Sequence, residues 1–103
     1  MVTRDVLVKE VEATFQDCLG ILAKKNVDYA KEKDAFANFR LSEMVGVGPE
    51  MANLLRVSDK LARISNLLDK PNVVVDETVA DTINDSINYM AILKSMLFHK
   101  DDK

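Results

Sequence analysis

The sequence predicts an all-α helical bundle of three long helices and one short helix, in a single domain of 103 residues. Two observations predict this fold class. Apolar residues recur every three or four positions over three long segments, as they do along one face of a helix. One proline, Pro49, is the first residue of such a segment and the other, Pro71, follows its end, and these are positions where helices start or end. Long helices in so short a chain leave apolar faces uncovered, so we expect a homo-oligomer to complete the bundle.

The first long helix is predicted from about Thr3 to Lys25. Its apolar residues follow helical spacing, and charged residues such as Lys9 and Asp17 lie on other faces. The residues expected to pack in the core are Val8, Val11, Phe15, Cys18, Leu19 and Leu22.

A polar segment with isolated aromatic residues follows and matches neither the helical nor the strand period well. We expect a connection through Asn26 and Asp28, because both residue types favour turns. A short helix is then predicted from about Asp34 to Met44, and the sequence GVGP at residues 46–49 ends it.

The second long helix is predicted from Pro49, at a first-turn position where its missing N–H costs little, to about Leu68. Its expected core face contains Leu54, Val57, Leu61, Ile64 and Leu68, and its opposite face contains Arg56, Asp59, Arg63 and Asn66. Proline disfavours helix in the residue before it, so the helix is expected to end before Pro71.

The last long helix is predicted from Glu77 to about Phe98, with Asp76 as its N-terminal cap. His99 and Lys100 follow at its negative end, where cations are favoured. The valines at 73–75 are strand-like in composition, but no second strand is apparent, so we expect an extended connector packed on the core.

Composition narrows the classes of function. The net charge of −3 argues against a nucleic-acid-binding surface. The lone Cys18 cannot form an internal disulfide, which suits a reducing compartment. No apolar stretch approaches the roughly 18 residues of a membrane span, and the N-terminus lacks the apolar block of a signal peptide. We therefore expect a cytoplasmic protein with no membrane or nucleic-acid partner.

An acidic stripe follows one side of the last predicted helix. It contains Glu77, Asp81, Asn84, Asp85 and Asn88, whereas Val79, Ile83, Ile87 and Met90 lie on a different face. Carboxylate oxygens are the ligands that Mg²⁺ prefers, and a bound Mg²⁺ neutralises polyphosphate charge and activates water. The stripe is either an ordinary solvated surface or the wall of such a magnesium site.

Two further groups of polar residues have the same two interpretations. On the second long helix, Asp59 and Arg63 have the spacing of an exposed ion pair, but in a site Asp59 could be another metal ligand. Lys60 and Arg63 would then hold phosphate oxygens. The segment KNVDYA contributes Lys25, Asn26, Asp28 and Tyr29, which either form a turn or bind a ligand. Phe36, Phe39 and Tyr89 either stack on a nucleobase or lie in the core.

Four fragments occur in an order that resembles a known family. KNVDYA, FANF, SDKLARISNLL and VVVDETVADTINDSINYMAIL, spread over residues 24 to 93, resemble the phage nucleotide-modification-associated family. That family is similar in turn to the all-α nucleoside triphosphate pyrophosphohydrolases, the MazG and dimeric dUTPase superfamily. Those enzymes use helical ExxE and ExxD motifs to bind Mg²⁺ and split a nucleoside triphosphate into a monophosphate and pyrophosphate.

The resemblance implies roles for particular residues of this chain. Catalysis would involve Asp59, Glu77 and Asp81, and Mg²⁺ would be held by Glu77, Asp81 and Asp85. The nucleotide would be bound by Lys25, Asn26, Asp28, Tyr29, Lys60, Arg63, Asn66 and Asn88.

The chain also departs from the superfamily's pattern. Glu77 and Asp81 are four positions apart, which is not ExxD, and the preceding helix contains no ExxE. A second hypothesis is therefore a non-catalytic protein that sequesters a nucleotide or a nucleotide signal. A third is a helical oligomerisation subunit without a small ligand.

Overall fold

The computed structural model describes residues 1–28, 34–69 and 77–101, without the side chains of residues 26–28, 77 and 78. These ranges contain α1 (Arg4–Asp28), α2 (Ala37–Arg40), the 3-10 helix η1 (Leu41–Val45), α3 (Pro49–Leu68) and α4 (Glu77–Phe98). They contain no β-strand, so the predicted all-α fold is confirmed for the described part of the chain. The predicted connector at 73–75 and the Asp76 cap lie outside the described residues.

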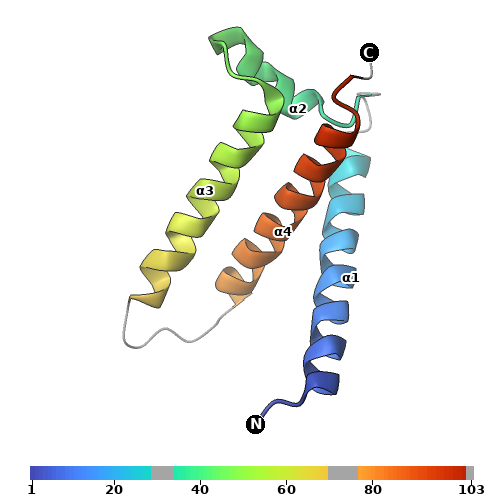
Figure 1. Cartoon of the computed structure of the whole chain (residues 1–103), viewed down its shortest axis with the longest axis vertical. Coiled ribbons are helices and arrows are strands. Elements are labelled where there is room, and N and C mark those ends of the chain that lie inside the picture. Colours follow the sequence, from blue (N-terminus) through green and yellow to red (C-terminus); the bar gives the residue numbers. More distant parts are fainter. Residues whose placement is uncertain (29–33, 70–76, 102–103) are drawn as a thin grey trace.

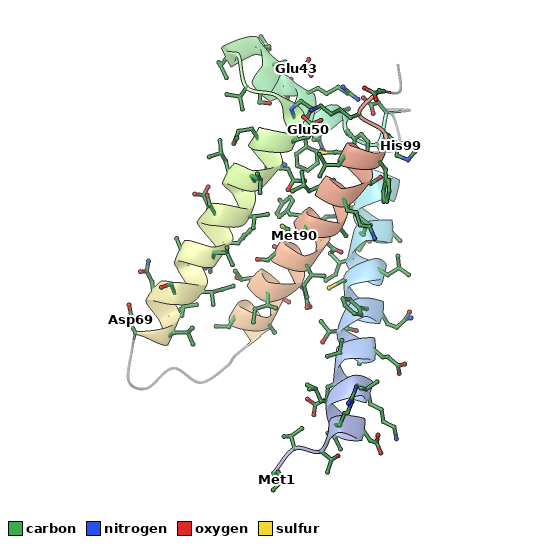
Figure 2. The ribbon with its side chains drawn as sticks, viewed as in Figure 1. Met1, Glu43, Glu50, Asp69, Met90 and His99 are labelled. Carbon is green, nitrogen blue, oxygen red and sulfur yellow. The ribbon has the colours of Figure 1, made fainter. Side chains whose placement is uncertain are left out.

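The three long helices are arranged around α4 (Figure 1). The neighbouring α3 runs in the opposite direction to α4, whereas α1 runs in the same direction on another side. At one end of the bundle, α2 and η1 lie where α1 finishes and α3 begins. At the other end, the first turns of α1 extend beyond the start of α4, towards Met1 (Figure 2). None of the described helices has the length and apolarity that a membrane span requires.

Helix α1 starts as its sequence predicts but ends later. The hydroxyl oxygen of Thr3 accepts a hydrogen bond from the N–H of Val6 at 3.3 Å, which satisfies one of the free donors of the first turn. The backbone stays helical to Asp28, so the predicted connection through Asn26 and Asp28 is wrong. Neither glycine nor proline occurs between Lys24 and Asp28, and the turn preference of two residues is too weak to stop a helix already formed.

The predicted helix from Asp34 to Met44 is divided into a turn, α2 and η1. Asp34 starts this segment, since its carboxylate accepts the N–H of Phe36 at 3.1 Å and pairs with Arg40. The guanidinium of Arg40 and the Phe36 hydrogen bond lower the pKa of Asp34. The hydroxyl of Ser42 bonds the carbonyl of Phe39 at 2.8 Å. Side-chain bonds of this kind compete with a regular helix and favour the tighter 3-10 turns seen here.

Helices α3 and α4 have the predicted ends, but α3 presents a different face to its neighbour. The less exposed residues of α3 recur at alternating spacings of four and three: Asn53, Val57, Lys60, Ile64 and Leu67. The leucines expected in the core, Leu54, Leu61 and Leu68, are 41%, 55% and 74% exposed. The inward face of α3 is thus turned by about one residue, and this rotation brings Asn53 next to Met96 and Lys60 next to Asp85 of α4.

The core of the single chain is small. Its buried apolar residues are Cys18, Phe39, Val57, Val79, Leu93 and Met96. Among the described side chains of α1 only Cys18 is buried, whereas the other predicted core residues Val8, Val11, Phe15 and Leu19 are exposed and Leu22 is half-buried. Much of the apolar surface that the sequence assigns to a core therefore faces outward in one chain.

Candidate functional site

One carboxylate of α4 connects all three long helices. Asp85 lies between Lys25 of α1 and Lys60 of α3, with its oxygens 3.7 Å and 3.4 Å from their ammonium nitrogens. We call these three residues the lysine junction. Two positive charges around one negative charge leave the junction net positive. The side chain of Asp85 is 26% exposed and that of Lys25 is 51% exposed, so an anion can reach it.

The ion pairs of the lysine junction are weak enough to be exchanged. Pairs this close to solvent contribute only about 0–1 kcal/mol each, whereas a hydrogen bond to a charged partner contributes about 1.5–3 kcal/mol. When a phosphate binds Lys25 and Lys60, the loss of either ion pair with Asp85 therefore costs little free energy. This geometry suits reversible binding of an anion.

Near the lysine junction, the side-chain amide of Asn88 and the thiol of Cys18 hold α1 against α4. The side-chain amide of Asn88 donates to the backbone carbonyl of Cys18 at 3.0 Å, and the Cys18 thiol donates to the carbonyl of Asn84 at 3.7 Å. Burial, with the nearby carboxylates of Asp17 and Asp85, raises the pKa of the thiol. Cys18 is therefore a protonated core residue, as predicted. Asn88 was predicted to orient a nucleotide, but here its amide nitrogen bonds the backbone of α1.

Other predicted site residues face solvent. Asp59, Arg63 and Asn66 are exposed on α3, and Asp81 is exposed on α4 one turn before Asp85. The structure thus brings Lys25 and Lys60 to Asp85, but it does not turn the Asp59 face of α3 towards α4. The side chains of Asn26, Asp28, Tyr29 and Glu77 lie outside the described residues, so their predicted roles stay predictions.

The donor set for magnesium within one chain is limited. Across the described residues, no three His, Cys, Asp or Glu side chains lie close enough together to hold one metal ion. Asp81 and Asp85 remain as two carboxylates one helical turn apart. This set fits Mg²⁺ only when a ligand adds oxygens, since Mg²⁺ in nucleotide sites commonly takes one or two carboxylates, several waters and the phosphates themselves.

Two aromatic residues near α2 are used to build the fold. Phe39 is only 5% exposed, and its ring meets Tyr89 edge to face at a centroid distance of 6.2 Å. The guanidinium of Arg56 lies over Phe39, 4.6 Å from the ring centroid. Phe39 is thus a core residue, and the base-stacking interpretation does not apply to it.

Sequence reasoning missed Asn53, which is fully buried between α3 and α4. Its amide nitrogen reaches the sulfur of Met96 at 3.9 Å, and its carbonyl oxygen has no hydrogen-bond partner among the described residues. The signal was present in the spacing, because Asn53 lies four residues before Val57 and seven before Lys60. The expected core face was assigned to the apolar Leu54, one position further on, because Asn53 is polar.

Comparison of the chain with models of protein families finds no match, and neither do comparisons with curated proteins and with solved structures.

Proposed function

We propose that this chain is a nucleotide-binding protein of the cytoplasm, and that it takes the polyphosphate of a nucleoside triphosphate at the lysine junction. The observation that carries the proposal is the convergence of Lys25 and Lys60, from two helices, on Asp85. Lysine ammonium groups are common phosphate ligands and act there as point charges. A triphosphate would satisfy both lysines and tie α1 to α3.

Magnesium would arrive with the nucleotide. Asp81 and Asp85 are the residues that would hold it, and the phosphates would complete its shell. When bound, Mg²⁺ neutralises phosphate charge and lowers the pKa of a water molecule. The positive charge of the lysine junction makes a protein-only magnesium site unfavourable, so we expect nucleotide and metal to bind together.

Hydrolysis between the α and β phosphates is the reaction that the motif resemblance supports. Sequestration of an intact nucleotide is the second candidate. It is favoured by the two ion pairs of Asp85, because a carboxylate that pairs with two ammonium groups is less available to a metal ion. The two candidates share the binding site and differ only in the fate of the ligand.

Calorimetric titration with a panel of nucleoside triphosphates, with and without Mg²⁺, tests the binding. Lys60→Met keeps the aliphatic stem but removes the charge, so Kd should rise about 10- to 100-fold, the equivalent of one charge-assisted contact. Lys9→Met is the matched control, since Lys9 is an exposed α1 lysine about 24 Å along the helix from Lys25. Equal affinities of the wild type and both variants would contradict the proposed site.

Chromatography of the ligand recovered from the same samples separates the candidates. Pyrophosphate release that Asp81→Ala abolishes, in a variant with an unchanged unfolding curve, would establish the enzyme. Recovery of intact triphosphate would establish sequestration. Unchanged turnover in Asp81→Ala would remove the metal role of Asp81.

A further inference from the structure

The outer side of α4 carries a strip with the spacing of a helix-packing seam. Its residues are separated alternately by four and three positions: Ile83, Ile87, Met90, Lys94 and Leu97. This alternation is the a/d pattern by which two helices pack knobs into holes. Ile83, Met90 and Leu97 are 39%, 49% and 56% exposed, so the strip is largely uncovered in the single chain.

The other sides of α4 already have partners. Leu93 and Met96 are buried, with Met96 next to Asn53 of α3, and Asn88 holds α1. At about 100° per residue, the outer strip lies nearly opposite Asp85 on the α4 helix. The strip is therefore a third face of α4, distinct from the faces that build the chain and the lysine junction.

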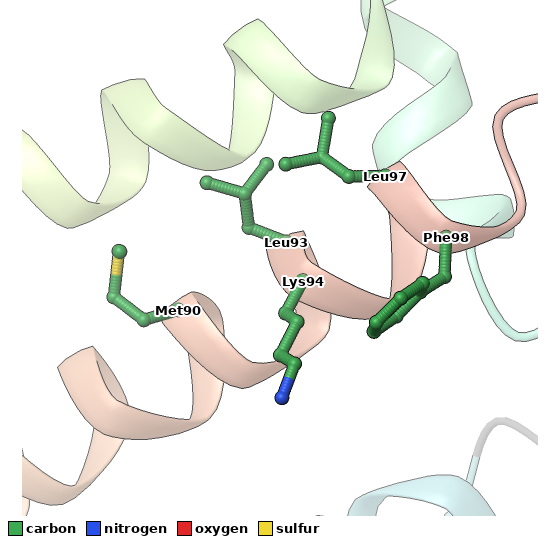
Figure 3. Close-up of a pocket in the computed structure, with 5 residues that line it drawn as sticks. All are labelled: Met90, Leu93, Lys94, Leu97 and Phe98. Atoms are coloured by element: carbon green, nitrogen blue, oxygen red, sulfur yellow. The ribbon is translucent and has the colours of Figure 1, made fainter.

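A pocket beside the strip can accept a side chain from another helix. It has a volume of about 390 Å³ and is lined by Met90, Leu93, Lys94, Leu97 and Phe98 (Figure 3). Four of these five residues are apolar, and the Lys94 ammonium is the polar exception. Such a hole along a seam is what a knob from a packed helix fills.

The chain also exposes more surface than a compact monomer of its mass does. The chain exposes 8301 Å², whereas a compact monomer of its mass exposes about 5,800 Å². Its radius of gyration is 16.0 Å, against about 13 Å for a closed domain of this length. Obligate homodimers bury about 1,000–2,500 Å² per partner, so a surplus of about 2,500 Å² per chain is enough to supply such an interface.

We propose that the outer strip of α4 packs antiparallel against the same strip of a second copy of this chain, forming a two-fold dimer. A second copy fits because the first four residues of the strip, Ile83 to Lys94, are spaced four, three and four, which is the same in both directions and lets them pair with themselves around a two-fold axis. Lys94 decides the direction. A parallel pair would place two ammonium groups face to face in the seam, whereas an antiparallel pair places Lys94 opposite Ile83 of the partner subunit. The two Lys94 positions are then about 16 Å apart along the helices.

Analytical ultracentrifugation of the wild type and of matched variants tests the interface. Met90→Glu should raise the dimer Kd by about 100-fold or more, because it buries a carboxylate at the centre of the seam, and a pair with Lys94 one turn on does not repay the lost hydration. Met44→Glu is the control, since Met44 is 85% exposed on η1, away from the strip. A monomeric wild type would overturn the proposal. So would a dimer that survives Met90→Glu and dissociates on Phe15→Glu, which would place the interface on α1.

Cysteine cross-linking tests the direction and does not depend on whether Met90→Glu folds. Chains with Ile83→Cys mixed with chains with Lys94→Cys should form a disulfide-linked heterodimer on air oxidation. Ile83→Cys alone should stay uncross-linked, and wild type, whose Cys18 is buried, is the background control. Cross-linking of Ile83→Cys with itself would show a parallel pair and overturn the proposed direction. Nucleotide binding is measured separately, because the lysine junction lies on the other side of α4.

Discussion

Asn53 is fully buried, and its carbonyl oxygen has no partner in the described part of the chain. A buried acceptor without a hydrogen bond costs about 1–3 kcal/mol, so the residue lowers the stability of α3 on α4. What it contributes instead is register, since a polar side chain at one position of a helix seam disfavours shifted pairings. Asn53 and Lys60 are the two polar members of the strip that α3 turns towards α4.

We predict that Asn53→Leu raises the free energy of unfolding by about 1 kcal/mol, because it removes the unpaired acceptor and keeps a branched side chain of similar shape. Urea unfolding measures this change. Asn66→Leu is the control on the same helix, where exposure should keep the change within about 0.5 kcal/mol. A loss of stability in Asn53→Leu would show that the carbonyl has a partner, such as a buried water.

Asp85 and Lys60 were predicted from the sequence to lie in one site, and the structure confirms only that they lie together. Both were expected near a site from their chemistry, and the structure brings them together with Lys25. Their neighbours Asp59 and Asp81 were expected beside them but are exposed. Asp59 is one position before Lys60, and one position along a helix is a rotation of about 100°, so a small error in the inward direction exchanges a junction residue for a solvated one.

At the scale of elements, the ends of α3 and α4 follow from local signals. Pro49 begins α3, and Gly46 ends the preceding 3-10 helix with φ of 81°, in the left-handed region. A Cβ added to Gly46 would meet no atom within 4 Å, so any cost of a side chain there comes from the backbone alone. This glycine therefore sets the direction in which α3 leaves η1.

We predict that Gly46→Ala lowers the free energy of unfolding by about 1 kcal/mol, the usual cost of a left-handed conformation for an L-residue. Thermal unfolding followed by circular dichroism measures it. Gly48→Ala is the matched control, because Gly48 has φ of −68° and its added Cβ would only touch Glu50 at an ordinary 3.5 Å. Equal effects of the two substitutions would contradict the backbone explanation.

For the whole molecule, the decisive quantity is surface that one chain leaves uncovered. Its small core and its 8301 Å² of exposed area support the dimer proposed above. In such a dimer folding and association would be linked, because the partner would bind only the folded chain.

We predict that the thermal midpoint of the wild type rises with protein concentration, by several degrees over a hundredfold range. That range supplies about 2.7 kcal/mol of stabilisation by mass action. Differential scanning fluorimetry at a series of concentrations measures the shift. Met90→Glu should remove the dependence, and a wild-type midpoint independent of concentration would contradict the linkage.

The order of residues alone was enough to define the all-α class, the span of α3 and α4, the start of α1 and the burial of Cys18, because these depend on short-range spacing and capping. Only the tertiary structure decided that α3 turns Asn53 and Lys60 inward, that α1 continues to Asp28, and that Lys25 reaches Asp85. Helix rotation and contacts between distant segments depend on how the faces of different helices fit one another, in apolar packing and in polar contacts. The spacing of residues within one helix does not show which face of another helix will pack against it.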